Sequence, residues 1–374
     1  MNKFLPQEIS KLRAFSQKAN TDTIHMGLGK PFEDMPVLLR NLAKEILENR
    51  SLKMDYTENG GLLPVRTLLE SHYRLRPGSL LLSHGAQEGI FASLFALLNA
   101  GDEVLLPNPG FVGYAPIVQG LGAKAVFYPL ASSKTGFEYS IDLIEKKVSR
   151  KTKVILINAP ANPTGTTATA EFVLELAKRF PKLKILSDEV YGELHFLDPY
   201  IPFCRYAKNI ISINAFSKSH ALTGWRIGWV GCEDTKIMQK ILVAHQYIAT
   251  CASVPAQHLI GALLSDQHPG LFDQIRDAYC AAYLVRRDEF FRGLDPELRN
   301  RTAVPEAGFY AFLPIPKKFS SSLKFAEKLL EKKNVLVTPG EFFGSLGKRY
   351  VRISYATSIE NIKLACERIH DLYS

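Results

Sequence analysis

The chain has 374 residues, of which 46% are hydrophobic and 22% charged, and its formal net charge is +9. This composition argues against disorder, and the length allows one large domain or two. Lys and Arg are scattered, and no basic run is interleaved with aromatics, so a solvated cationic surface is favoured over a nucleic-acid partner.

The cysteines and the hydropathy of the chain indicate its cellular location. The five cysteines are widely spaced, odd in number and never arranged as Cys-x-x-Cys, which argues against a disulfide framework or a zinc site. Residues 1–10 lack the apolar core of a signal peptide, and the best apolar run, residues 89–98, is about half a membrane span. We therefore predict a cytoplasmic protein without a membrane contact and without a metal.

Three motifs stand in the first quarter of the chain. Residues 25–31, His-Met-Gly-Leu-Gly-Lys-Pro, form a glycine-rich loop that includes Gly29 and Lys30. Tyr56 follows, in Asp-Tyr-Thr-Glu-Asn-Gly-Gly. The segment 85–98 begins Gly-Ala-Gln-Glu-Gly and reads as a helix, whose free N-terminal N–H groups and dipole suit a phosphate.

Short apolar strands separated by helices fill the middle of the chain. Strands are predicted at residues 104–107, 123–129, 154–158, 183–188, 210–214 and 226–231. Near-continuous apolar strands with intervening helices such as Ala170–Arg179 indicate a mostly parallel sheet that is covered on both faces. This is α/β architecture, in which ligands bind at the carboxyl ends of the strands.

Two polar motifs follow predicted strands. In Asn158-Ala-Pro-Ala-Asn162-Pro-Thr-Gly165, Pro and Gly fix a turn, and Asn162 either donates its amide to a ligand or simply forms an Asn-Pro turn. Asp188 ends an apolar strand, where a buried carboxylate is costly without a cationic partner. The alternative for Asp188 is a helix N-cap, since Asp before a helix is common.

Lys218 lies in Phe-Ser-Lys-Ser-His, shortly before Arg226 in Gly-Trp-Arg. A lysine between small hydroxyl residues can form a Schiff base with an aldehyde cofactor, and the guanidinium fork of Arg226 can bind a phosphate bidentately. With Lys218 present, a protonated ring nitrogen becomes the favoured partner of the Asp188 carboxylate.

After about residue 275 the pattern changes. A helix at 278–293, a strand at 308–313, a helix at 323–332, a strand at 350–355 and a helix at 359–372 are predicted. This order indicates a smaller α+β domain. The second of these strands contains Arg352.

These motifs, in this order, resemble those of the fold-type-I, pyridoxal-phosphate-dependent aminotransferases of class I/II, over roughly residues 25–357. The resemblance implies a large cofactor-binding domain at residues 41–275 with a mostly parallel seven-stranded sheet. It implies a small α+β domain formed by residues 1–40 and 276–374. It also implies a homodimer.

The resemblance assigns pyridoxal 5′-phosphate as the cofactor. Lys218 would hold it as a Schiff base and move the substrate proton, with Asp188 at the ring nitrogen and Tyr191 and Asn162 at the ring oxygen. Phe111 would stack on the ring, although a core phenylalanine is the alternative. The phosphate would be held by Ala86, Gln87, Ser217 and Arg226, and by Tyr56 of the neighbouring subunit.

The substrate side is implied in the same way. Arg352 would bind the α-carboxylate bidentately, the alternative being a surface arginine, while Gly29 and Lys30 would line the entrance. Lys30 either pairs with the distal carboxylate of a dicarboxylic substrate or is solvated. Ala215 stands where many members carry a phosphate-binding serine, for which Ser217 can compensate.

The implied activity is transfer of an amino group from an L-amino acid to a 2-oxo acid. The same fold and lysine also serve carbon–sulfur β-lyases, which remain an alternative because pocket geometry decides the fate of the carbanion. A non-catalytic regulator that binds the cofactor is less favoured, since too few residues precede His25 for a winged-helix domain.

Overall fold

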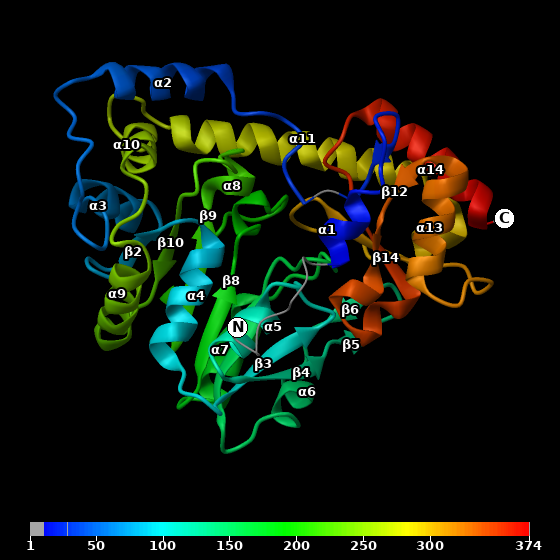
Figure 1. Cartoon of the computed structure of the whole chain (residues 1–374), viewed down its shortest axis with the longest axis horizontal. Helices are drawn as coiled ribbons and strands as arrows, with labels where there is room; N and C mark the ends of the chain where they lie inside the picture. The colour runs from blue at the N-terminus through cyan, green and yellow to red at the C-terminus, as the bar shows by residue number, and fades with distance from the viewer. Residues whose placement is uncertain (1–10, 28, 374) are drawn as a thin grey trace.

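The computed structural model describes residues 11–27 and 29–373, and a mostly parallel sheet lies at its centre. Within the described residues the strands follow the order β2-β10-β9-β8-β7-β3-β4, and only β10 is antiparallel to its neighbours (Figure 1). Their bounds are Leu80–Ser83 (β2), Glu103–Asn108 (β3), Lys124–Pro129 (β4), Thr152–Asn158 (β7), Lys184–Asp188 (β8), Ile210–Ala215 (β9) and Gly228–Gly231 (β10). The predicted α/β fold with a seven-stranded sheet is confirmed.

Strand β2 was missing from the predicted strands. Its sequence, Leu-Leu-Leu-Ser, contains no β-branched or aromatic residue and stands directly before a helix. A short leucine run cannot be distinguished from the start of a helix by periodicity alone, and only its partner β10 makes it a strand.

Successive residues of the central strands enter two separate cores. In β8, Leu186 packs into the core under α4 (Ala86–Leu97) and α9 (Thr235–Ala249). Its neighbour Ile185 points to the other face, in the core that also contains residues of α7 (Ala170–Arg179). Burial on both faces explains why these strands read as continuous apolar runs.

A second, smaller group of elements lies beside the central sheet (Figure 1). It contains an antiparallel sheet in the order β11-β14-β13 and a parallel pair of β1 with β12. Its bounds are Tyr310–Pro314 (β11), Thr338–Pro339 (β13), Tyr350–Ser354 (β14), Ile24–His25 (β1), Val335–Leu336 (β12), Ser322–Lys333 (α13) and Ile359–Tyr373 (α14). The β1–β12 pairing brings the N-terminal part of the described chain to its C-terminal part.

The long helix α11 (Leu271–Gly293) joins the two groups of elements. It begins earlier than the predicted helix at 278–293, because Leu271, Phe272 and Ile275 extend its buried face. The predicted domain boundary at residues 275 and 276 therefore falls inside an unbroken helix.

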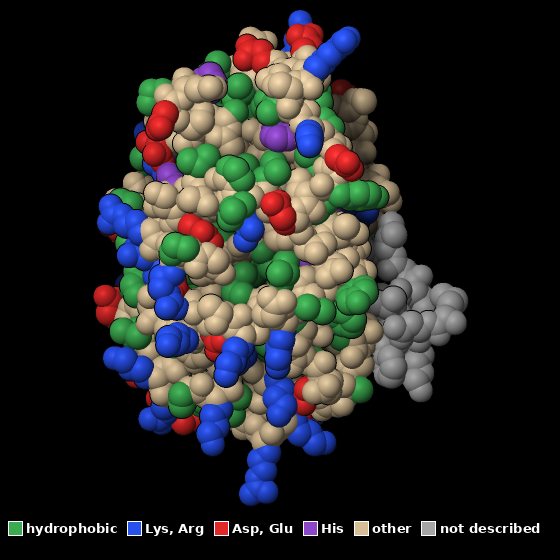
Figure 2. All heavy atoms as spheres, turned by 90° about the vertical axis from the view of Figure 1, so that its left-hand side faces the viewer, with side chains coloured by type: hydrophobic (Ala, Val, Ile, Leu, Met, Phe, Trp, Pro, Cys, Tyr) green, Lys and Arg blue, Asp and Glu red, His purple; other side chains and the backbone are tan. Residues whose placement is uncertain are grey.

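One outer face carries many exposed hydrophobic side chains. It is formed by α9, by α2 (Val37–Glu48), by α3 (Leu63–His72) and by α10 (Val254–Leu263), and Figure 2 shows hydrophobic side chains gathered across its middle. Exposed members on these helices are Val37, Leu38, Leu47, Leu63, Val243 and Tyr247. We call this surface the apolar face.

The remaining elements are short. They are Lys11–Ser16 (α1), Tyr114–Gly120 (α5), Ala131–Ser132 (β5), Phe137–Glu138 (β6), Ile141–Glu145 (α6), Phe216–Ser219 (α8), Pro296–Asn300 (α12) and the 3₁₀ turns Gly192–Leu194 (η1), Phe203–Arg205 (η2), Gly340–Phe343 (η3) and Ser345–Arg349 (η4). Among the described helices, none combines the length and the apolar character that crossing a bilayer requires.

Candidate active site

Three neighbouring parallel strands place the predicted motifs at one edge of the sheet. Strand β7 ends at Asn158, β8 ends at Asp188 and β9 ends at Ala215. Helix α8 follows β9 directly and carries Lys218. The carboxyl ends of parallel strands meet at the same edge, which is where α/β proteins bind their ligands.

The Lys218 amine is the central group of this edge. Its Nζ donates a hydrogen bond of 2.6 Å to the carbonyl oxygen of Gly29, in the N-terminal loop. Burial, followed by the charges of Arg352 and Arg226, lowers the pKa of Lys218 to about 8, although Asp188 opposes the shift. The neutral amine is the form that attacks a carbonyl carbon, and near pH 8 it is well populated.

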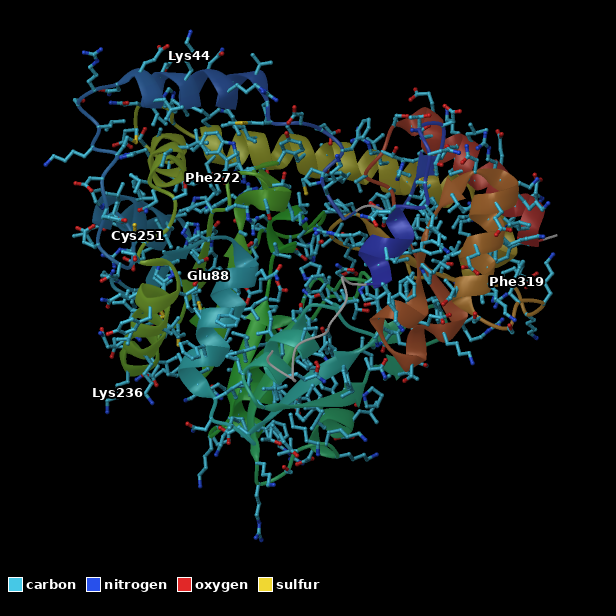
Figure 3. All side chains as sticks on the ribbon, in the orientation of Figure 1. Lys44, Glu88, Lys236, Cys251, Phe272 and Phe319 are labelled. Atoms are coloured by element: carbon cyan, nitrogen blue, oxygen red, sulfur yellow. The ribbon has the colours of Figure 1, made fainter. Side chains whose placement is uncertain are left out.

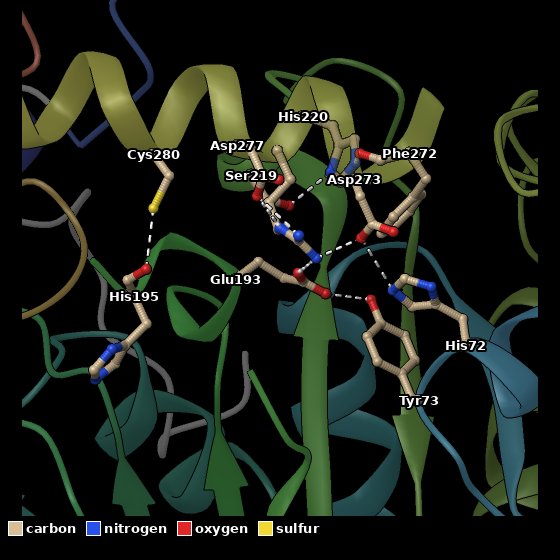
Figure 4. Close-up of polar contacts among 11 residues, drawn as sticks. His72, Tyr73, Glu193, His195, Ser219, His220, Phe272, Asp273, Asp277 and Cys280 are labelled. Atoms are coloured by element: carbon tan, nitrogen blue, oxygen red, sulfur yellow. Dashed lines mark hydrogen bonds and ion pairs between the residues drawn. The ribbon is translucent and has the colours of Figure 1, made fainter. Parts of the chain in front are cut away.

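A buried histidine holds the turn that bears the lysine. His220 Nδ1 lies 2.8 Å from Ser219 Oγ, and His220 Nε2 lies 3.1 Å from the carbonyl oxygen of Phe272 in α11 (Figure 4). Burial lowers the pKa of His220 to about 3, so its ring is neutral. His220 therefore fixes α8 against α11 and offers no acid or base to the site.

Asp188 presents a buried carboxylate. Its Oδ2 accepts a hydrogen bond of 2.6 Å from the Tyr114 hydroxyl, and its Oδ1 accepts a longer one, 3.3 Å, from the amide of Val190. Burial raises the pKa of Asp188 despite these donors and despite Lys218. Asp188 caps no helix, since η1 starts later and has Tyr191 at its N-cap position. A protonated ring nitrogen would satisfy this carboxylate.

Arg352 is a buried arginine, not a surface one. Its Nη1 donates 2.8 Å to Asn162 Oδ1 and its Nη2 donates 2.7 Å to the carbonyl oxygen of Gly27. Its guanidinium carbon lies 4.4 Å from the centre of the Tyr310 ring and 5.0 Å from that of Phe343. Its buried Nε has no hydrogen-bond partner among the described residues. This fork is suited to a carboxylate ligand.

The turn before α4 forms an anion cup. Gly85, at φ +78°, is the N-cap of α4, and no side chain caps that helix end, where Ala86 and Gln87 follow. A Cβ at Gly85 would lie only 2.9 Å from Arg226 Nη2, so glycine leaves room for the guanidinium. Arg226 Nη2 also donates 3.3 Å to the carbonyl oxygen of His84. Free N–H groups and a cation at one helix end suit a phosphate.

Side chains behind the cup fix its backbone. Glu88 accepts a hydrogen bond of 3.1 Å from the amide of His84, and its other oxygen lies 3.0 Å from His245 Nδ1. The His84 ring in turn lies 3.0 Å from the carbonyl oxygen of Cys251, and Figure 3 shows Glu88 and Cys251 on this side of the sheet. The cup is thus tied to α9 and to the turn after it.

Two aromatic residues that the sequence did not single out belong to this site. Tyr114, on α5, bonds Asp188 and packs edge-on against Phe111, with ring centres 5.3 Å apart. Tyr310, on β11, accepts a hydrogen bond of 3.1 Å from the hydroxyl of Tyr191. Both contacts join residues far apart in the chain, and no local motif signals them.

Some predicted residues stand apart from this cluster. Tyr56 is 82% exposed and makes no ring contact or hydrogen bond to a described site residue within its own chain. Lys30 is exposed, and its ammonium has no ion pair among the described residues. Ser217 is buried on α8, beside Lys218. Leu28, in the predicted entrance loop, and residues 1–10 lie outside the described residues.

The residues present fit a ring that carries an aldehyde, a basic nitrogen and a phosphate. Lys218 supplies an amine that is neutral near pH 8, and Asp188 supplies a buried carboxylate that needs a cation. The cup at Gly85 leaves uncapped N–H groups beside Arg226. Each of the three functional groups expected on the cofactor therefore has a partner of matching chemistry.

Comparison with known proteins identifies a family over nearly the whole chain. The family described as "Aminotransferase class I and II" matches residues 22–369. Aspartate aminotransferase of Pyrococcus horikoshii is 34% identical over 96% of this chain and 93% of its own length. Aromatic-amino-acid aminotransferase 2 of Thermococcus litoralis is 32% identical over 97% and 95%. The structure of Thermus thermophilus aspartate aminotransferase with maleate superposes with a TM-score of 0.89, at 26% identity, over 98% of this chain and 97% of that one.

Proposed function

Because this chain belongs to the class I and II aminotransferases, which use pyridoxal 5′-phosphate, we propose a role for each residue around Lys218. The protein is a transferase that moves an amino group between an amino acid and a 2-oxo acid. The relatives favour this activity over a carbon–sulfur β-lyase or a non-catalytic regulator. The roles depend above all on one observation. Lys218, whose pKa is lowered, and the buried Asp188 carboxylate lie at the same edge of the sheet.

The proposed cofactor site uses the groups of that edge. Lys218 would attach the cofactor through Nζ, and Asp188 would keep the ring nitrogen protonated. Tyr191 and Asn162 would donate to the ring oxygen, and Phe111 would stack on the ring. The phosphate would be held by the first turn of α4 at Ala86 and Gln87, by Ser217 and by Arg226.

The proposed chemistry needs each group in a distinct state. When bound, the cofactor ring supplies an electron sink for the pair released at the substrate α-carbon. Lys218 Nζ would take the proton from that carbon and return it at the cofactor's aldehyde carbon, for which the amine must be neutral. Arg352 and Asn162 would hold the α-carboxylate and so orient the substrate for loss of its α-proton to Lys218.

The proposed assembly is a homodimer in which Tyr56 reaches the cofactor phosphate of the neighbouring subunit. Tyr56 is highly exposed, and its segment lies beside the apolar face. Exposed hydrophobic surface of this kind marks a protein interface. Asn59 Nδ2 donates 2.8 Å to the carbonyl oxygen of Thr250, which fixes the segment against the end of α9.

Two further statements belong to the proposal. The five cysteines are all free, in keeping with a cytoplasmic location. The division into a large domain, 41–275, and a small domain, 1–40 with 276–374, is supported by the β1–β12 pairing for the described residues.

The amino donor is not named by the relatives, whose names include both aspartate and aromatic amino acids. Lys30 remains a candidate for the distal carboxylate of a dicarboxylic donor, and its exposed position equally suits a solvated lysine. We therefore propose an aminotransferase in which Arg352 binds the substrate α-carboxylate. The measurement below identifies which donor side chains it accepts.

The test is the visible absorption spectrum of the purified protein with pyridoxal phosphate. We expect a yellow band that bleaches when single L-amino acids are added without any oxo acid, and the effective ones name the donors. Accumulation of pyruvate and ammonia from a β-substituted alanine would instead identify a lyase. A protein that acquires no band would contradict the proposed cofactor site.

A further inference from the structure

Tyr310 contacts several residues of the proposed active site, although no role is assigned to it above. It is the first residue of β11 and is buried. In the β11–β14 register Phe312 stands opposite Arg352, so Tyr310 is the diagonal neighbour of Arg352 on the same face. This register stacks the Tyr310 ring on the guanidinium, with the ring centre 4.4 Å from the guanidinium carbon.

The Tyr310 hydroxyl makes two further contacts. It lies 3.1 Å from the Tyr191 hydroxyl, which donates to it. It also lies against Gly29, where an added Cβ would stand 2.7 Å from the hydroxyl oxygen, so a side chain at Gly29 would force the phenol to shift. Gly29 is the residue whose carbonyl oxygen receives Lys218 Nζ. One phenol thus lies among the arginine, the second tyrosine and the loop that contacts the lysine.

In a pair of hydrogen-bonded hydroxyl groups, one hydroxyl can strengthen the hydrogen bond that the other donates. Each hydroxyl donates one hydrogen bond and also accepts, so when Tyr191 donates to a ring oxygen, Tyr310 can donate to Tyr191. Hydrogen bonds in such a chain strengthen one another, especially in a buried site. The Tyr310 hydroxyl therefore sets how strongly Tyr191 can stabilise negative charge on the ring oxygen.

We propose that Tyr310 is a positioning residue with two separable actions. Its ring orients Arg352 for the substrate α-carboxylate, and its hydroxyl strengthens the hydrogen bond from Tyr191 to the cofactor ring oxygen. This proposal depends on the proposed roles of Arg352 and Tyr191. Phe343, whose ring lies 5.0 Å from the guanidinium carbon of Arg352, shares the first action and offers a matched control for it.

The test compares the wild type with Tyr310→Phe, Phe343→Leu and Tyr310→Leu, each loaded with pyridoxal phosphate. The first measurement is the pH midpoint at which the visible band of the bound cofactor changes. The second is KM for whichever of L-aspartate, L-glutamate and L-phenylalanine bleaches the wild-type band. Circular dichroism checks that each variant is folded.

The two actions predict changes in different quantities, the pH midpoint for the hydroxyl and KM for the ring. Tyr310→Phe loses the hydroxyl and keeps the ring, so its midpoint should rise by roughly 0.5 to 1 pH unit while KM stays within about twofold. Phe343→Leu should raise KM about tenfold without moving the midpoint. Tyr310→Leu should show both changes.

Three results would overturn the proposal. They are an unmoved midpoint in Tyr310→Phe, a tenfold rise of KM in that variant, or an equal midpoint shift in Phe343→Leu, which would indicate general loosening of the site. Absence of a visible band in the wild type would contradict the proposed cofactor site itself. The two failures are therefore distinguishable.

Discussion

Lys218 shows how the environment of a single side chain can suit it to the two tasks proposed for it. An exposed lysine is protonated near neutral pH and neither attacks a carbonyl group nor accepts a proton. Burial and the two arginines lower the pKa of Lys218 to about 8, while Asp188 limits the shift. The same arginines are the proposed anchors of phosphate and carboxylate, so the groups that bind the ligands also favour the neutral amine.

This environment predicts a pH dependence for cofactor attachment. The amine must be neutral to react, so the rate constant for incorporation into the cofactor-free protein should rise with pH up to about 8 and level off above it. Stopped-flow absorbance measures this rate. Lys218→Ala is the control, and it should keep the fold, lose turnover and form no covalent band. A midpoint near the ordinary lysine value of 10.5 would contradict the assigned environment.

The contrast between Lys218 and Tyr310 marks the limit of prediction from sequence at this scale. Lys218, Asp188 and Arg352 each stand in a recognisable local motif, and their roles remain predictions from the resemblance. Tyr114 and Tyr310 act on residues 74 and 119 positions away in the chain. Such contacts depend on sheet order and register, which the local pattern does not contain.

At the scale of elements, three acids stand at the end of β8 and in the turns that follow it. Asp188 faces the site, whereas Glu189 turns away and accepts 2.6 Å hydrogen bonds from Tyr200 and Ser212. Glu193 accepts one of 2.5 Å from Tyr73, within the polar cluster of Figure 4. Burial raises the pKa of both glutamates to about 7. These acids hold the turn that presents Tyr191.

Glu189 should therefore make the fold more stable in weak acid than in weak base. Its pKa is raised in the folded state, so the folded protein binds more protons than the unfolded chain between pH 4.5 and about 7, and stability falls as pH rises through that window. Between pH 5 and 8 this group should lower the free energy of unfolding by on the order of 2 kcal/mol, and Glu189→Gln should remove that decrease.

Thermal unfolding at the two pH values measures this difference. Glu331→Gln, an exposed glutamate on α13, is the matched control and should keep the wild-type slope. If Glu189→Gln lost as much stability with rising pH as the wild type, another group would carry the dependence.

The elements themselves were largely predictable, because α7 and α14 have clear helical periodicity, whereas β2 needed its partner strand.

At the scale of the whole molecule, the proposed dimer makes a prediction that a monomer does not. If Tyr56 acts across the interface, a mixed dimer of Lys218→Ala and Tyr56→Ala contains one site with both wild-type residues. Co-refolded equal amounts should then recover about a quarter of the wild-type activity at limiting pyridoxal phosphate, since half of the dimers are mixed. Assays of the mixture against each variant alone provide the measurement, and no recovery would place Tyr56 outside the partner's site.

The Arg352–Asn162 contact has a consequence for selectivity. The guanidinium of Arg352 already has an amide oxygen, a carbonyl oxygen and two aromatic rings around it. A substrate carboxylate at the proposed Arg352 site would have to displace these hydrogen-bond partners. Its binding free energy would then be the difference between the new and the old contacts. A full negative charge wins such an exchange, because charge-assisted hydrogen bonds are the stronger ones. A neutral amide or alcohol does not, so in its proposed role Arg352 would select against amines that lack a carboxylate.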